Sequence, residues 1–205
     1  MKTFVIAGIG TEIGKTFISA IITEALEADY WKPVQAGDPA DTDYIRRHIS
    51  NKRTFCHPEG YRLKAPMSPH AAAAAEGINI DLDRLAVPPT ANHMIIELAG
   101  GLMVPLNPNQ LNTDLVSMWD LPVILVSQNY LGSINHTLLS VAALNQLNIK
   151  VAGIIFNGDP NPATEDFILA HTGLPCIAKI ARQAELTKES IKQLAAGLRP
   201  KLMQL

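Results

Sequence analysis

The chain has 205 residues, of which 47% are hydrophobic and 18% charged, and its formal net charge is −2. This length and composition indicate a single globular domain over residues 1–205 and argue against a disordered chain. Basic and acidic residues are mixed along the sequence, so we expect no nucleic-acid partner. No apolar run reaches the roughly 18 residues that a membrane-spanning helix needs, so we expect no membrane partner. The two cysteines, Cys56 and Cys176, are too few for a disulfide framework or a zinc cluster and predict free thiols in the cytoplasm.

Short apolar runs alternate with longer amphipathic segments along most of the chain. The apolar runs predict buried strands at 3–7, 30–34, 94–98, 123–127 and 151–157, with a further candidate at 175–181. The amphipathic segments predict helices at 16–28, 111–119, 133–147, 162–172 and 187–199. Residues 35–93 are less regular because prolines interrupt them. Apolar strands with intervening helices predict an α/β fold of three layers, a mostly parallel central sheet covered by helices on both faces.

Polar and glycine-rich segments follow the predicted strands, at 8–16, 35–43, 99–107, 128–135 and 157–162. Ligands of parallel sheets bind beyond the carboxyl ends of the strands. We therefore expect the functional site to be built from these segments.

The first of these segments has the features of a phosphate-binding loop. It reads Gly8-Ile9-Gly10-Thr11-Glu12-Ile13-Gly14-Lys15-Thr16 and lies between a predicted strand and a predicted helix. Small residues let backbone N–H groups surround an anion, the lysine neutralises its charge, and the hydroxyl can hold a magnesium ion. Five residues separate Gly8 from Gly14, whereas the strict Walker pattern has four. The competing interpretation is a plain turn between strand and helix.

The five-residue spacing, with Thr11-Glu12 inside it, resembles the modified phosphate loop of dethiobiotin synthetases. The resemblance continues in the same order along most of the chain, through Lys32-Pro33-Val34, Met67-Ser68-Pro69-His70, Ile96-Glu97-Leu98-Ala99-Gly100-Gly101, Leu131-Gly132-Ser133-Ile134-Asn135-His136 and Asn157. It implies a P-loop NTPase-like fold and a homodimer. It also implies a ligase that uses ATP and Mg²⁺ to close a cyclic urea on 7,8-diaminopelargonic acid with CO₂. The product is dethiobiotin, and the reaction is the penultimate step of biotin biosynthesis.

The resemblance also implies roles for individual residues. The catalytic residues would be Lys32, Lys15 and Thr11. The ATP-binding residues would be Gly10, Thr11, Glu12, Ile13, Gly14, Lys15, Thr16, Phe17, Glu97, Gly100 and Asn157. The substrate would be bound by Lys32 and, from the neighbouring subunit, by Ser133, Ile134 and Asn135. The metal ligands would be Thr16, Asp43 and Glu97.

The chemistry of these residue types agrees with the implied roles but leaves alternatives. Glu97 lies in an apolar strand, where a carboxylate is costly unless it is paired or bound to metal. Asp43 competes with Asp41 as the metal ligand, and either could simply cap a helix. Ser133 could likewise be a plain helix cap, and Asn157 a turn residue before Gly158.

Departures from the family pattern leave the nucleotide preference open. Gly10, Leu98 and Ala36 stand where the family commonly has aspartate, glycine and serine, and residues 178–181 lack the Gly and Pro of its base-binding segment. A related switch ATPase would carry a lysine early in the phosphate loop, and this loop has Ile9, Gly10 and Thr11 there. A nucleotide-binding protein without catalysis is the third alternative.

Overall fold

The computed structural model describes residues 1–183 and 185–205 and contains a six-stranded parallel sheet. The strands follow the spatial order β2-β5-β1-β6-β7-β8. Their bounds are β1 Thr3–Gly8, β2 Asp29–Trp31, β5 Met94–Glu97, β6 Val123–Gln128, β7 Val151–Asn157 and β8 Cys176–Ile180. All five strand pairs are parallel. The predicted strands therefore form one central sheet.

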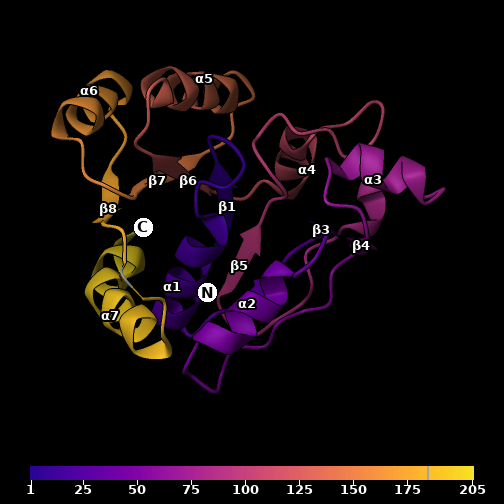
Figure 1. The fold of residues 1–205 in the computed structure, drawn as a ribbon, viewed down its shortest axis with the longest axis horizontal. Coiled ribbons are helices and arrows are strands. Elements are labelled where there is room, and N and C mark those ends of the chain that lie inside the picture. The colour runs from indigo at the N-terminus through magenta and orange to yellow at the C-terminus, as the bar shows by residue number, and fades with distance from the viewer. Residues whose placement is uncertain (184) are drawn as a thin grey trace.

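Helices cover both faces of this sheet (Figure 1). One face carries α1, Lys15–Leu26, and α7, Lys188–Gln204; the other carries α4, Asn112–Trp119, α5, Ser133–Gln146, and α6, Pro162–Thr172. Side chains alternate across the strands, so Phe4 and Ile6 pack on the α1 side while Val5 and Ala7 pack on the other. The predicted three-layer α/β fold is confirmed.

The strand predicted at 30–34 is divided in the structure. β2 ends at Trp31, and a new strand, β3, Val34–Ala36, pairs in parallel with β4, Tyr61–Leu63, as a small second sheet. Pro33 lies at the division and has no N–H to donate to a ladder. The division turns Lys32 out of the main sheet beyond the end of β2.

The irregular segment 35–93 contains two further helices and a short 3₁₀ turn. They are α2, Asp41–His48, α3, Pro69–Ala75, and the 3₁₀ turn Leu82–Arg84. Pro69 is the first residue of α3, a position where its missing N–H costs nothing. The helix α7 continues to Gln204, beyond the predicted end at 199, with Pro200 inside it. Leu202, which is buried, anchors this last turn in the core beside α1.

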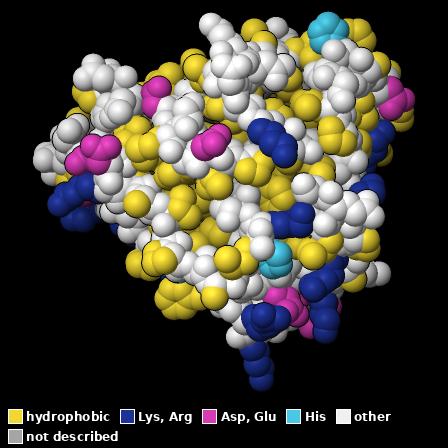
Figure 2. Space-filling model, turned by 180° about the vertical axis from the view of Figure 1, so that it is seen from behind, with side chains coloured by type: hydrophobic (Ala, Val, Ile, Leu, Met, Phe, Trp, Pro, Cys, Tyr) yellow, Lys and Arg dark blue, Asp and Glu magenta, His cyan; other side chains and the backbone are white. Residues whose placement is uncertain are grey.

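Seen from behind, basic and acidic side chains stand singly or in small groups among apolar and neutral ones (Figure 2). Among the residues that the structure describes, no helix combines the length and the apolar character needed to cross a membrane.

Candidate nucleotide and metal site

The phosphate loop leaves the end of β1 and enters α1 through Gly14. Gly14 has a φ of +87°, in the left-handed region that favours glycine, and a Cβ there would lie 2.2 Å from Nδ2 of Asn157. That Nδ2 donates a hydrogen bond to the carbonyl oxygen of Ile13 at 2.9 Å. Asn157, at the end of β7, thus supports the backbone of the loop, and its role in binding ATP stays a prediction.

Lys15, the first residue of α1, is folded back over the loop. Its Nζ donates to the carbonyl oxygen of Gly10 at 2.9 Å, and the residue is 7% exposed. Burial lowers the pKa of the Lys15 ammonium, Glu97 and Asp41 oppose the shift and the charge of Lys32 adds to it, and the resulting pKa is about 8. With a pKa of about 8, roughly nine-tenths of the Lys15 side chains are charged at pH 7.

Glu97 ends β5 and is 1% exposed, yet both of its oxygens have hydrogen-bond donors. Its Oε1 accepts from Oγ1 of Thr16 at 2.9 Å and from Nζ of Lys32 at 3.0 Å. Its Oε2 accepts from the hydroxyl of Tyr30 at 2.9 Å. Burial and the Glu97 charge raise the pKa of Tyr30 well above its usual value, so the phenol remains a donor.

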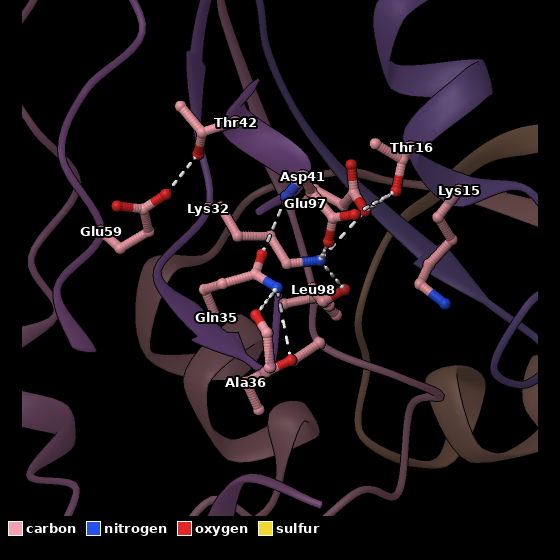
Figure 3. Close-up of polar contacts among 12 residues, drawn as sticks. Lys15, Thr16, Lys32, Gln35, Ala36, Asp41, Thr42, Glu59, Glu97 and Leu98 are labelled. Atoms are coloured by element: carbon pink, nitrogen blue, oxygen red, sulfur yellow. Dashed lines mark hydrogen bonds and ion pairs between the residues drawn. The ribbon is translucent and has the colours of Figure 1, made fainter. Parts of the chain in front are cut away.

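Asp41, the first residue of α2, is the second carboxylate of the site (Figure 3). Its Oδ2 lies 2.6 Å from Nζ of Lys32, and its Oδ1 accepts from Oγ1 of Thr16 at 2.9 Å. Burial alone would raise the pKa of Asp41, but the Lys32 charge and hydrogen bond and the Thr16 hydrogen bond outweigh it and lower that pKa. Its backbone N–H donates to Oε1 of Gln35 at 3.1 Å, which fixes where α2 begins.

The structure places Asp41, and not Asp43, beside Thr16, Lys32 and Glu97. Asp43 is exposed and pairs with Arg46 at 3.1 Å. Two residues along a helix correspond to a rotation of about 200°, so Asp43 faces away from the face that carries Asp41. The residue at which α2 begins determines which aspartate faces the site, and the sequence does not define that residue.

Lys32 is the fixed cation of the cluster. It is 4% exposed, and besides the two carboxylates it donates to the carbonyl oxygen of Leu98 at 3.3 Å. Burial lowers the pKa of Lys32, but the charges and hydrogen bonds of Glu97 and Asp41 more than compensate, and the net direction is upward. Lys32 therefore stays charged at alkaline pH values at which Lys15 loses its proton.

The donor set around Thr16 fits a hard cation. Its hydroxyl carries one hydrogen, yet Oγ1 lies 2.9 Å from a carboxylate oxygen of Asp41 and from one of Glu97. One of these two contacts must lack a proton in this arrangement. Among the described residues no three His, Cys, Asp or Glu side chains form a metal cluster. Two carboxylates and a hydroxyl, completed by phosphate oxygens and water, are the oxygen ligands that Mg²⁺ prefers.

A cavity of about 660 Å³ joins the loop to this cluster. Eight of the residues assigned from the sequence line it: Thr11, Glu12, Gly14, Lys15, Thr16, Lys32, Glu97 and Gly100. Within the described part of the chain, its lining does not include Gly10, Ile13, Phe17, Asn157, Asp43, Ser133, Ile134 or Asn135. Gly10, Ile13 and Asn157 shape the loop instead, through the contacts given above and the burial of Ile13 in the core.

Tyr30 and Gln35 support the site through hydrogen bonds and were not assigned from the sequence. Tyr30 lies two residues before Lys32, so strand alternation places both side chains on the face that carries Glu97. Gln35 follows Lys32 by three residues and clamps the turn before α2 by donating to the carbonyl oxygens of Ala36 and Gly37 at 3.3 and 3.1 Å.

The start of α5 lies outside the cavity. Ser133 is buried, and its backbone N–H donates to the carbonyl oxygen of Tyr130 at 2.9 Å. Next to it, the side chain of Leu131 is fully exposed, and the Tyr130 hydroxyl lies 2.8 Å from Nδ1 of His136.

Solved structures of low sequence identity share this fold. A ParA family ATPase from Chlorobium tepidum superposes with a TM-score of 0.60 at 13% identity, over 99% of this chain and 91% of its own. A putative plasmid partition protein from Borrelia burgdorferi, bound to AMPPNP, superposes with a TM-score of 0.63 at 14% identity, over 100% and 99%. The chain thus has a P-loop NTPase-like fold with a phosphate loop after its first strand.

Sequence relatives identify the family. A family model described as an AAA domain matches residues 2–190. An ATP-dependent dethiobiotin synthetase from Cytophaga hutchinsonii is 48% identical over 200 residues, 97% of each chain. Another from Christiangramia forsetii is 45% identical over 206 residues, 100% of this chain and 99% of its own. The chain belongs to the dethiobiotin synthetase family, which confirms the resemblance seen in its motifs and makes it an enzyme of the ligase class.

Proposed function

We propose that this chain closes the cyclic urea of dethiobiotin on 7,8-diaminopelargonic acid, using CO₂ and ATP and releasing ADP and phosphate. This would be the penultimate step of biotin biosynthesis. The observation that carries the proposal is one cavity in which a phosphate loop meets the buried cluster of Lys32, Asp41 and Glu97. Family membership supplies the substrate.

The loop and the start of α1 would bind the triphosphate. Backbone N–H groups at the helix start favour an anion, and Lys15 can leave the Gly10 carbonyl to reach the β- and γ-phosphates. Mg²⁺, when bound, would neutralise charge on these phosphates, and Thr16, Asp41 and Glu97 would hold it. Phosphoryl transfer depends mainly on such positioning and charge stabilisation.

Lys32 would hold the reacting carbamate. One amine of the substrate adds CO₂ and loses a proton, giving a carbamate. A carbamate oxygen attacks the γ-phosphorus, ADP leaves, and a carbamic–phosphoric anhydride forms. The second amine attacks the carbonyl carbon and expels phosphate, which closes the ring. The Lys32 ammonium, fixed by two carboxylates, is suited to stabilise negative charge on the carbamate and on the migrating phosphoryl group.

A homodimer would complete the site. The helix start at Ser133, Ile134 and Asn135 can bind a carboxylate but does not line this cavity in the described chain, so a second copy would have to present it. Exposed Leu131 at the same turn supports an interface there. A cytoplasmic location belongs to the same proposal and is supported by the free thiols of Cys56 and Cys176.

A coupled assay tests the function. Purified protein is given ATP, Mg²⁺, bicarbonate and 7,8-diaminopelargonic acid, and the products are identified by mass. We expect ADP and dethiobiotin in equal amounts, no ADP without the diamine, and loss of both in Lys32→Ala but not in Lys52→Ala, which changes an exposed lysine. ATP hydrolysis that ignores the diamine and yields no dethiobiotin would refute the proposal and favour a switch ATPase.

A further inference from the structure

Tyr30 makes a contact with the metal and phosphate site that the mechanism above does not use. It lies in the middle of β2, is fully buried, and donates its hydroxyl to Oε2 of Glu97 at 2.9 Å. The rest of its ring packs in the apolar cluster between the sheet and α1. Leaving a buried hydroxyl without a hydrogen-bond partner costs free energy, and Glu97 supplies the partner for Tyr30.

The geometry around Glu97 divides its two oxygens between different tasks. Oε1 faces Thr16 and Lys32, and so faces the cavity, whereas Oε2 is turned into the core toward Tyr30. Because Oε2 is turned into the core, Oε1 is the oxygen that can contact a cation in the cavity. Tyr30 thereby limits the rotation of the carboxylate as well as its position.

The strand register explains why this pair is set so firmly. β2 and β5 are parallel neighbours, with Tyr30 opposite Ile95 and Trp31 opposite Ile96, so the residue after β2 lies beside Glu97. Tyr30 and Lys32 are two residues apart, so their side chains point to the same face, and both contact the Glu97 carboxylate. Lys32 contacts the outer oxygen and Tyr30 the inner one.

We propose that Tyr30 is a positioning residue that holds Glu97 with Oε1 toward the nucleotide-bound cation. This inference rests on the proposed role of Glu97 as a metal ligand but not on the identity of the diamine substrate. Removing a side chain that orients a metal-binding carboxylate lowers the affinity for the metal by about 10- to 100-fold. The expected effect of Tyr30→Phe is therefore a weaker cation site with little change in nucleotide binding when no divalent cation is present.

Tyr44 offers a matched control. Its hydroxyl is buried and, within the described residues, has no hydrogen-bond partner, so Tyr44→Phe removes a buried hydroxyl without removing a contact to the site. Any general effect of exchanging tyrosine for phenylalanine in this core would appear in both variants.

The experiment measures Mn²⁺ binding by electron paramagnetic resonance, with the full-length protein and saturating ADP. We expect the Mn²⁺ dissociation constant to rise about 10-fold or more in Tyr30→Phe and to stay within twofold of wild type in Tyr44→Phe. The dissociation constant of ADP without Mn²⁺ should change less than twofold in both. An unchanged Mn²⁺ constant in Tyr30→Phe would overturn the proposal.

A double-mutant cycle separates this proposal from the one on which it rests. If Tyr30 acts through Glu97, Tyr30→Phe should have no further effect on Mn²⁺ binding in a Glu97→Gln background. Equal effects in both backgrounds would overturn the positioning role, whereas an unaltered Mn²⁺ constant in Glu97→Gln itself would instead remove Glu97 from the metal site. Tyr30→Phe keeps the ring and removes a single oxygen, and thermal unfolding followed by circular dichroism confirms that the variant is folded before Mn²⁺ is added.

Discussion

Lys15 should take up a proton when ATP binds at alkaline pH. Without nucleotide its pKa is about 8, because burial opposes the charged ammonium. The phosphates would bring several negative charges within contact distance, which returns the pKa of a lysine to about 10 or above. At pH 7 roughly nine-tenths of the free protein then already carries the proton, and at pH 9 only about one-tenth does.

The magnitude follows from this change of protonated fraction. Because the bound state requires the charged form, the dissociation constant of ATP should rise about 10-fold between pH 7 and pH 9, equivalent to about 1.4 kcal/mol. Binding should absorb about 0.9 protons per site at pH 9 and about 0.1 at pH 7. The sign is fixed by the direction of the shift, since a pKa that rises on binding means that protons are taken up.

Isothermal titration calorimetry with a non-hydrolysable ATP analogue, in buffers of different ionisation enthalpy, measures this uptake. Lys15→Arg is the control, because a guanidinium is charged throughout this range and should abolish the uptake. Protons taken up by the nucleotide itself appear in both proteins, so subtracting the Lys15→Arg value leaves the uptake by Lys15. Proton uptake near zero at pH 9 in wild type, or equal uptake in Lys15→Arg, would refute the burial argument.

Three further substitutions test the loop and the metal site. Asp41→Asn should lower kcat by about 100-fold or more and raise the Mg²⁺ concentration needed for activity, while Asp43→Asn should keep kcat within about twofold of wild type. Steady-state assays at varied Mg²⁺ measure both variants. Equal losses of kcat would contradict the proposal that Asp41, and not Asp43, holds the metal. Gly14→Ala should lower the free energy of unfolding in urea by about 1–3 kcal/mol and abolish ATP binding, because its φ is positive and its Cβ would meet Asn157; a normal urea midpoint would speak against this strain. Asn157→Ala should lower the free energy of unfolding by about 1 kcal/mol and weaken ATP binding, because the Ile13 carbonyl oxygen loses its hydrogen-bond donor. An unchanged ATP affinity in calorimetry would show that Asn157 has no role in the loop.

The sequence predicted the layers of the fold because each layer has a local pattern. Apolar runs and amphipathic helices can be seen within ten to fifteen residues, and α6 begins and ends where its pattern predicts. The division at Pro33 could be expected from the proline alone, but its consequence, a separate small sheet with β4, depends on contacts 27 residues along the chain, between Val34 and Tyr61. Spatial strand order is likewise absent from any local window.

The candidate site was predictable where a motif carried it and not where packing did. Lys15 and Thr16 follow from the loop, and Glu97 from a carboxylate in an apolar strand. The contact between Lys32 and Glu97 joins residues 65 apart and requires β2 and β5 to be neighbours. The choice of Asp41 required the first residue of α2, which the Gln35 side chain sets through a tertiary contact.

The central claim is that a carbamate oxygen of the substrate attacks the γ-phosphate of ATP in this cavity. Single-turnover reaction with carbonate labelled in all oxygens by ¹⁸O, started before the label exchanges with water, tests it directly. The mechanism predicts one ¹⁸O in the released phosphate and one in the urea carbonyl of dethiobiotin, both seen by mass spectrometry. Phosphate without label, beside labelled dethiobiotin, would contradict the account, because the second carbamate oxygen would then have left by a route that does not pass through phosphorus.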